Sequence, residues 1–298
     1  MSPRGSIEQL RKGHAMSSIH LGGCTLQTQR FGTEGSALCL HSCGEGPPLV
    51  LLHSLLADRE SFERVLQALS RRHRVLLADL PGFGASDPAP GGLHAVADRV
   101  AEGLRLALGD VRPTLLGNGY GGFVALLTAI RHPHRVRSLV LADCGATFDA
   151  PGRAAFVGMA RAAGASGLQA VADVAMRRLF APDFQARNPD LIERCKQRFL
   201  ATAPQTFQEA CAALSTLDLR EDAVGLKLPT LVLVGEHDEA TPPAMARELA
   251  GFVPGARLRL LEGCAHVPQL QAPQAFLAEV DAFLGQPAAS AGVSAADA

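Results

Sequence analysis

Two residues near the C-terminal end have the types and the spacing of a general acid–base pair. Asp238 ends the run GEHD at 235–238, and His266 follows 28 residues later in the run GCAHVP at 263–268. A carboxylate bonded to one imidazole nitrogen fixes the tautomer of the ring and raises the basicity of the other nitrogen. If the fold brings them together, His266 can act as a general base that Asp238 orients.

The segment 115–122, LLGNGYGG, has the residues of a tight turn between a strand and a helix. In the nucleophile elbow G-x-S-x-G, such a strained turn raises a nucleophile above a sheet, and Gly117 and Gly121 would be its two glycines. The nucleophile position then falls on Gly119, which has no side chain. Because losing the serine of a working triad costs on the order of 10⁶ in kcat, an ordinary acyl-enzyme mechanism at this position is excluded.

The same segment also satisfies a second motif. Gly117, Gly119 and Gly122 match the dinucleotide fingerprint G-x-G-x-x-G, and Asp143 lies 21 residues after Gly122, where a ribose-binding carboxylate would be. That fingerprint normally opens the first strand–helix–strand unit, whereas at least two strand–helix units precede it here. We therefore favour the elbow, and we expect neither a cofactor nor a metal.

The elements that would position these residues alternate between strand and helix patterns. Apolar runs rich in Val and Leu occur at 49–53, 75–79, 114–117, 136–143 and 230–235, and helical patterns occur at 59–70, 93–108, 121–131 and 242–251. Continuous apolar runs suit parallel strands buried on both faces. We predict an α/β fold with a mostly parallel, doubly wound sheet, led by a hairpin within 24–42 that turns at 32–36.

The alternation stops near residue 147. Residues 147–220 are rich in Ala and Arg and have helical periodicity without a convincing strand. We interpret them as a helical lid, inserted after the sixth strand and covering the active site. The core then comprises residues 19–146 and 221–285, flanked by an extension at 1–18 and a small-residue tail at 286–298 that we expect to be disordered.

Five motifs, in order along the chain, resemble the α/β-hydrolase fold family. They are HS at 53–54 in place of an H-G turn, DLPGFGAS at 79–86, PHRVRSLVL at 133–141, and the two runs that hold Asp238 and His266. Within that family, residues from about 30 to 285 resemble 3-oxoadipate enol-lactonases, including the segment 179–220. The resemblance implies lactone hydrolysis by a Ser–His–Asp triad without a cofactor. The sequence departs from this pattern at Gly119, and at Leu179, where Trp is expected.

The predicted site includes further residues beside the Asp238–His266 pair. The backbone N–H groups of Leu55 and Tyr120 would form the oxyanion hole, and such donors are worth about 3 kcal/mol each. The candidate substrate-binding residues are His53, Ser54, Asn118, Arg177 and Arg178. The two arginines either meet a substrate carboxylate or are solvated surface charges. A bracing role is more frequent for His53 and for Asp79. Asp143 is an alternative acid, and Cys144 and Cys264 are alternative nucleophiles that more often serve as small buried residues.

Composition limits the partners. The 28 basic and 29 acidic residues give a net charge of −1, so no global field favours nucleic acid or an anionic membrane. No run of 18 apolar residues occurs, so no transmembrane helix is predicted. Seven cysteines without a CxxC pair indicate a reducing compartment. We expect a cytoplasmic protein that binds a small molecule, with a homodimer as one arrangement.

Three functions remain open from the sequence. In the first, His266 and Asp238 work without a covalent intermediate on a small carbonyl compound, such as an acidic lactone, an ester or a β-keto acid. The base would activate water, or would deprotonate the substrate for C–C cleavage, decarboxylation or isomerisation. In the second, an enol-lactonase or esterase has an engineered serine-to-glycine change at Gly119. In the third, the chain binds a ligand without catalysis.

Overall fold

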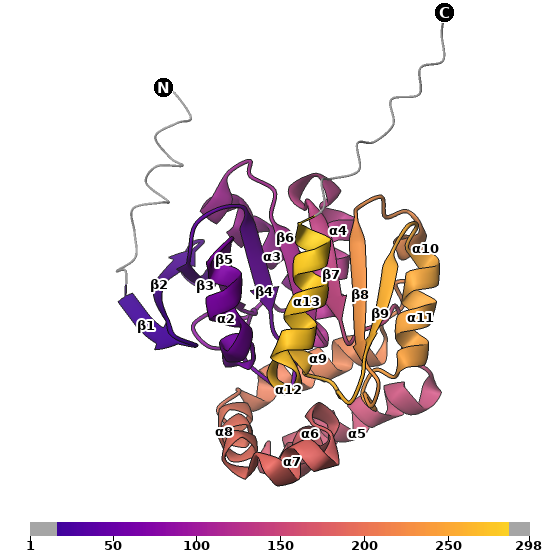
Figure 1. Ribbon diagram of the computed structural model, residues 1–298. Coiled ribbons are helices and arrows are strands. Elements are labelled where there is room, and N and C mark those ends of the chain that lie inside the picture. Colours follow the sequence, from indigo (N-terminus) through magenta and orange to yellow (C-terminus); the bar gives the residue numbers. More distant parts are fainter. Residues whose placement is uncertain (1–16, 286–298) are drawn as a thin grey trace, which may run out of the picture.

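The computed structural model describes residues 17–285, and most of them form one sheet with helices on both faces (Figure 1). The predicted disorder of 1–16 and 286–298 lies outside the described residues. Within the described range the strands are β1 (Ser17–Leu21), β2 (Cys24–Phe31), β3 (Leu38–Cys43), β4 (Pro48–Leu52), β5 (Arg74–Asp79), β6 (Thr114–Asn118), β7 (Ser138–Ala142), β8 (Thr230–Gly235) and β9 (Arg257–Leu261).

The helices alternate with these strands on both sides of a helical insertion. Those of the core are η1 (Arg59–Phe62), α2 (Glu63–Ser70), α3 (Gly92–Leu108), α4 (Tyr120–Arg131), η2 (Pro133–Arg135), α10 (Arg220–Val224), α11 (Pro243–Phe252), α12 (Pro268–Gln271) and α13 (Pro273–Leu284). The helical insertion consists of α5 (Ala150–Ser166), α6 (Gln169–Leu179), α7 (Pro182–Arg187), α8 (Pro189–Leu200) and α9 (Pro204–Ser215), between β7 and β8.

The sheet has the order β1-β2-β3-β5-β4-β6-β7-β8-β9. From β5 to β9 every neighbouring pair is parallel, whereas β1, β2 and β3 pair antiparallel with their neighbours. All residues of β6, β7 and β8 are buried, as expected for strands covered on both faces. Helices α2 and α13 cover one face, and α3, α4 and α11 cover the other (Figure 1). The predicted α/β class and parallel sheet are confirmed.

Two strands were not predicted. The first, β1, includes Ser17 and Ser18, which the sequence interpretation assigned to the N-terminal extension, and it makes the expected hairpin a three-stranded meander. The helical insertion therefore follows the seventh strand and not the sixth. The second, β9, is an edge strand whose sequence RLRLL is mostly exposed. Its charged positions hid the apolar run that identified the inner strands.

The helical insertion lies beyond one end of the sheet, at the bottom of Figure 1. Its entry and exit meet in a β-bridge between Thr147 and Asp218, close to the predicted bounds 147 and 220. The Arg153 side chain donates hydrogen bonds to the carbonyl oxygens of Phe148 (2.8 Å) and Leu217 (2.9 Å), which ties both connections together. The helical insertion is thus attached to the sheet through a narrow, hydrogen-bonded base.

Candidate active site

The Asp238 carboxylate is held in the turn that follows β8. Its Oδ1 accepts hydrogen bonds from the backbone N–H groups of Ala240 (2.8 Å) and Thr241 (3.0 Å). Its Oδ2 accepts from His266 Nδ1 (2.9 Å) and from the Thr241 hydroxyl (2.7 Å). Burial disfavours the charged carboxylate, but the attraction of His266 and these hydrogen bonds outweigh it and lower the pKa of Asp238. The sequence did not single out Thr241, although it lies three residues after Asp238.

His266 sits in the loop that precedes α12, and a neighbouring turn holds this loop in place. The Asn118 side-chain Nδ2 donates to the carbonyl oxygen of His266 (2.8 Å), and Asn118 Oδ1 accepts from Gln269 Nε2 (3.0 Å). Asn118 is fully buried. It therefore positions the histidine loop, and the structure does not place it in a substrate cavity as the sequence interpretation did.

Asp143, the alternative acid, is a second buried carboxyl beside the pair. It follows β7 with a φ of 52°, and its Oδ1 accepts from the Gly235 N–H (2.8 Å). Burial and the nearby charge of Asp238 raise the pKa of Asp143 well above its usual value, so the protonated form is favoured. Because Asp143 is fully buried, it is also not positioned to hold a ribose hydroxyl, which removes the main support for the dinucleotide interpretation.

Gly119 has the backbone of a nucleophile elbow without the nucleophile. It stands between β6 and α4 with φ 54° and ψ −119°, a region of backbone space that only glycine enters without strain. A Cβ built on Gly119 would lie 2.5 Å from Ser54 Oγ and 2.6 Å from His266 Nε2. The elbow therefore points at the base, and a hydroxyl from another loop fills the space beside it.

That hydroxyl belongs to Ser54, which follows β4. Its Oγ lies 3.2 Å from His266 Nε2. The carbonyl oxygen of Ser54 accepts from His53 Nδ1 (2.9 Å) and from the Ala57 N–H (3.3 Å), so the residue is fixed from behind. The sequence singled out Ser54 as a substrate-binding residue, whereas its closest polar partner is the base itself.

His53 is a brace for this loop. Its Nε2 accepts from the Leu80 N–H (3.2 Å), and its ring meets Phe83 edge-on, with centroids 5.0 Å apart. Both ring nitrogens are thus used by backbone groups, and burial lowers the pKa of His53. His53 does not border the cavity at His266, so the structure does not support the predicted contact with substrate.

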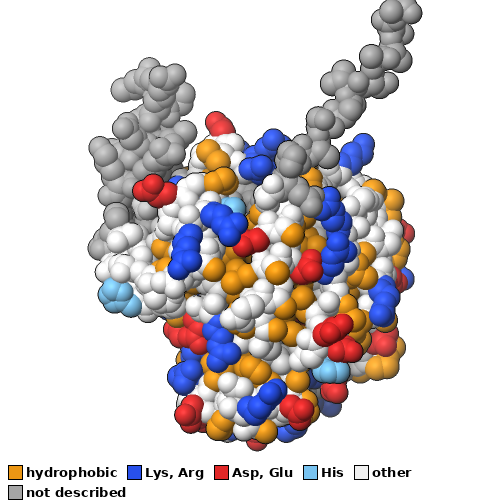
Figure 2. All heavy atoms as spheres, viewed as in Figure 1, with side chains coloured by type: hydrophobic (Ala, Val, Ile, Leu, Met, Phe, Trp, Pro, Cys, Tyr) orange, Lys and Arg blue, Asp and Glu red, His pale blue; other side chains and the backbone are white. Residues whose placement is uncertain are grey.

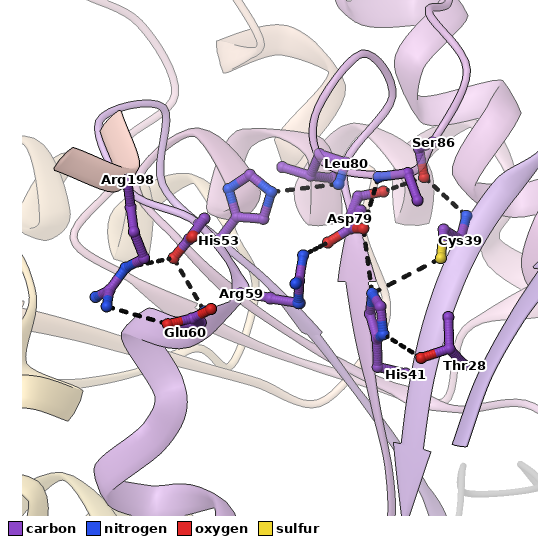
Figure 3. Close-up of polar contacts among 12 residues, drawn as sticks. Thr28, Cys39, His41, His53, Arg59, Glu60, Asp79, Leu80, Ser86 and Arg198 are labelled. Atoms are coloured by element: carbon purple, nitrogen blue, oxygen red, sulfur yellow. Dashed lines mark hydrogen bonds and ion pairs between the residues drawn. The ribbon is translucent and has the colours of Figure 1, made fainter. Parts of the chain in front are cut away.

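Behind the brace lies a closed polar cluster around Asp79 (Figure 3). Its carboxylate accepts from Arg59 (2.7 Å) and pairs with His41 Nε2 (3.1 Å), and His41 Nδ1 bonds Thr28 Oγ1 (2.8 Å). Burial opposes ionisation, but the hydrogen bond with His41 and the charge of Arg59 outweigh it and lower the pKa of Asp79 to about 2. Burial raises the pKa of the adjacent Cys39 thiol to about 12, which disfavours a thiolate metal ligand.

A cavity of about 390 Å³, counted with its open mouth, lies in front of His266. Its walls are mostly apolar: Leu55, Leu56, Phe123, Phe148, Phe156, Met159 and Leu214 line it together with Ser54, Gly119, Tyr120, Ala240 and Thr241. Arg178 is the charged residue among its lining residues, and no ion pair of Arg178 occurs within residues 17–285. Arg177 is exposed and does not border the cavity.

The two residues predicted to supply the oxyanion hole, Leu55 and Tyr120, both line this cavity. Leu55 follows Ser54, and Tyr120 is the first residue of α4, where the helix dipole favours negative charge. Neither N–H donates a hydrogen bond to the described part of the chain. The turn after β4 and the turn after β6 lie close together, and the Gly121 N–H donates to the His53 carbonyl oxygen (3.0 Å). Only glycine fits this contact, because a Cβ on Gly121 would lie 2.2 Å from the Leu52 carbonyl oxygen.

The two candidate thiols, Cys144 and Cys264, are buried, and their surroundings disfavour the thiolate form. Burial raises the pKa of Cys144, and burial raises that of Cys264 to about 11. Neither thiol is among the residues that line the cavity. Since the thiolate is the nucleophilic form of cysteine, neither residue replaces the missing serine.

Comparison with known proteins identifies the class. A family model described as the alpha/beta hydrolase fold matches residues 47–273, and the chain belongs to that family. It is 33% identical over 270 residues to 2-hydroxymuconate semialdehyde hydrolase of Pseudomonas putida, covering 83% of this chain and 90% of that protein. It is 32% identical over 252 residues to pimeloyl-[acyl-carrier protein] methyl ester esterase of Aeromonas hydrophila, covering 81% and 97%.

A solved structure resembles the chain closely. The enol-lactonase from Burkholderia xenovorans LB400 superposes with a TM-score of 0.80 and 31% identity, covering 87% of this chain and all of that one. The chain also spans 12% of the length of polyketide synthase ThaQ of Burkholderia thailandensis, to which it is 32% identical over 249 residues. These relatives confirm the predicted family and the resemblance to an enol-lactonase.

The surface carries both signs of charge. On the face shown in Figure 2, basic and acidic side chains are interspersed among apolar ones, with no large area of a single sign. Among residues 17–285, no helix combines the length and the apolar character needed to cross a membrane.

Proposed function

We propose that the protein hydrolyses an ester or lactone of a small substrate that carries an apolar chain and a carboxylate. The observation that carries this proposal is the His266–Asp238 pair at a cavity that Leu55 and Tyr120 also line, and the N–H groups of these two residues donate no hydrogen bond within residues 17–285. In this arrangement Asp238 keeps the proton on Nδ1, and Nε2 is free to take a proton from an attacking group.

The oxyanion hole supplies the second part of the chemistry. Attack on a carbonyl carbon places a negative charge on the carbonyl oxygen, which the N–H groups of Leu55 and Tyr120 would stabilise. Donors that are already fixed before the reaction need no reorganisation when this charge forms, which is why they lower the barrier. The close contact of the two turns through Gly121 holds the donors in place.

The cavity walls support the substrate class. Aromatic and aliphatic side chains from α4 and the helical insertion suit an apolar chain, and the helical insertion would serve as the lid. Arg178 brings a positive charge to the cavity and has no ion pair in the described residues, so a substrate carboxylate would form an ion pair with it. The relatives are named for hydrolysis of a methyl ester, of a semialdehyde and of an enol-lactone, which supports hydrolysis of a carbonyl compound.

The test compares two p-nitrophenyl esters of matched length, the glutarate half-ester with a free carboxylate and the neutral pentanoate. We expect faster hydrolysis of the half-ester. Arg178→Met should lower kcat/KM for the half-ester by roughly 10- to 100-fold, because a hydrogen bond to a charged group is worth about 1.5–3 kcal/mol, and should leave the pentanoate nearly unchanged. Arg177→Met is the matched control, since this arginine is exposed.

Two results would contradict parts of this proposal. If neither ester nor 3-oxoadipate enol-lactone is turned over, while the half-ester still binds in calorimetry, the protein is a ligand-binding protein and the hydrolase proposal is wrong. If the pentanoate is the better substrate and Arg178→Met has no effect, hydrolysis stands but the acidic substrate class does not.

A further inference from the structure

We propose that Ser54 is the nucleophile of this protein and replaces the serine that the elbow motif would have at position 119. The proposal rests on the proposed hydrolase function and specifies the group from which His266 takes a proton. The sequence suggested two uses for the base, on water or on the substrate carbon. The structure offers a third partner, because the Ser54 hydroxyl is hydrogen-bonded to His266 Nε2 at 3.2 Å.

The position of this hydroxyl carries the argument. A side chain on Gly119 would begin 2.5 Å from Ser54 Oγ and 2.6 Å from His266 Nε2. The space in front of the base is therefore shared between the two turns, and only one of them can fill it with a hydroxyl. Gly119 leaves that space to Ser54, and residues of both turns line the cavity.

The surroundings of Ser54 also fit a nucleophile. The hydroxyl borders the cavity, and in the described residues it has no other polar partner than His266 Nε2. Two donors fix the carbonyl of Ser54, the His53 ring and the Ala57 N–H. The Leu55 N–H follows directly, so it stands one residue after the nucleophile, as the Tyr120 N–H does for Gly119. His53 is then a positioning residue that acts through Ser54.

The reaction balances without a cofactor. His266 Nε2 takes the proton of Ser54 Oγ as Oγ attacks the carbonyl carbon and the carbonyl π electrons move to oxygen. The tetrahedral intermediate collapses, the bond to the leaving oxygen breaks, and His266 gives its proton to that oxygen. Water then attacks the acyl group on Ser54 while His266 takes its proton. The Oγ–acyl bond breaks, Oγ regains the proton, and an acid and an alcohol result.

The first measurement uses the unmodified protein, so it does not depend on the folding of a variant. The full chain is treated with diisopropyl fluorophosphate, which phosphorylates an activated serine with loss of fluoride, and peptide mass spectrometry locates the adduct. We expect a single adduct on the peptide that contains Ser54. The His266→Ala variant should not be labelled, because its Ser54 has no base.

The second measurement uses two variants and the p-nitrophenyl half-ester. Ser54→Ala should lower kcat/KM by on the order of 10⁴- to 10⁶-fold, the cost of losing a nucleophile. The double variant Ser54→Gly/Gly119→Ser moves the hydroxyl to the elbow and should regain activity over Ser54→Gly alone. A purely structural role for Ser54 would not be rescued by a hydroxyl on the other turn.

The outcomes separate this proposal from the function on which it rests. If Ser54→Ala hydrolyses the half-ester as well as the unmodified chain, and His266→Ala does not, Ser54 is not the nucleophile and the base acts on water. If the unmodified chain is inactive and unlabelled, while the double variant is active, both the Ser54 proposal and the hydrolase proposal fail.

Discussion

Two buried aspartate–histidine pairs occur within residues 17–285, and they differ in the group that the second histidine nitrogen contacts. In one, Asp238 Oδ2 bonds His266 Nδ1 at 2.9 Å; in the other, Asp79 Oδ2 bonds His41 Nε2 at 3.1 Å. The free nitrogen of His266 faces a serine hydroxyl at a cavity. The other nitrogen of His41 is bonded to Thr28, which lies opposite it on the neighbouring strand β2.

The difference shows that the presence of a hydrogen-bonded aspartate and histidine does not by itself make a catalytic pair. Asp79 is also bonded to Arg59 and to the backbone N–H of Ala85, so its charge is used to hold the loop after β5. Asp238 has no arginine partner in the described residues, and its charge is directed to the imidazole. The Asp79–His41 pair, called the closed pair below, stabilises the fold. The Asp238–His266 pair, called the open pair, is positioned to move a proton.

The largest expected effect is on catalysis at the open pair. Asp238→Asn removes the charge that orients His266, and kcat/KM for the p-nitrophenyl half-ester should fall by about 10⁴-fold, as expected when the acid of a triad loses its charge. Steady-state kinetics on the folded variant measures this. A fall of less than tenfold would show that the open pair is no more catalytic than the closed one.

The next effect is on stability at the closed pair. Asp79→Asn leaves the partly buried Arg59 without its partner, and breaking a buried ion pair in this way costs about 3–5 kcal/mol. Urea unfolding followed by circular dichroism should show this loss, while kcat/KM per folded molecule stays within a few-fold of the unmodified value. Loss of activity at unchanged stability would mean that the Asp79 cluster takes part in the chemistry.

The pH dependence of stability tests the charge of Asp79 in the closed pair. The folded pKa of Asp79 is lowered from 3.8 to about 2, so its stabilisation is present above about pH 4 and is lost as the pH falls toward 2. A shift of this size is worth about 2 kcal/mol. The difference in unfolding free energy between the unmodified chain and Asp79→Asn should therefore shrink by about that amount from pH 6 to pH 2. If the difference in unfolding free energy stays constant from pH 6 to pH 2, the Asp79 carboxylate is not ionised in the folded protein in the way proposed.

The smallest effect is expected at Asp143. Its pKa is raised, because it is buried beside Asp238, and a protonated carboxyl resembles an amide in shape. Asp143→Asn should therefore keep kcat/KM within a few-fold, in contrast to Asp238→Asn. If the two variants lose activity equally, the acid function is shared between the carboxyls.

The sequence predicted the scaffold better than the distribution of roles within the site. Apolar runs identified the inner strands because those strands are buried on both faces, whereas β9 was missed because its arginines interrupt the pattern. Asp238, His266 and Gly119 were found through their motifs and come together in the structure. Local residue types could not show that Ser54 bonds the base, since the two residues are separated by 212 positions.

The same limit applies to the residues expected to contact substrate. His53 and Asn118 are polar residues beside the catalytic turns, which favoured such a contact, but backbone partners from other loops use both side chains. Arg177 and Arg178 could not be separated by sequence, because only the direction of α6 decides which of them faces the cavity.

We propose that the His266–Asp238 pair makes this chain a hydrolase although the elbow has no serine. The most direct test is kcat/KM for the p-nitrophenyl half-ester in the unmodified protein and in His266→Ala, with thermal unfolding to confirm that both are folded. We predict hydrolysis by the unmodified protein and a loss of at least about 10⁴-fold in the variant. Equal hydrolysis by both folded proteins would show that His266 is not the catalytic base.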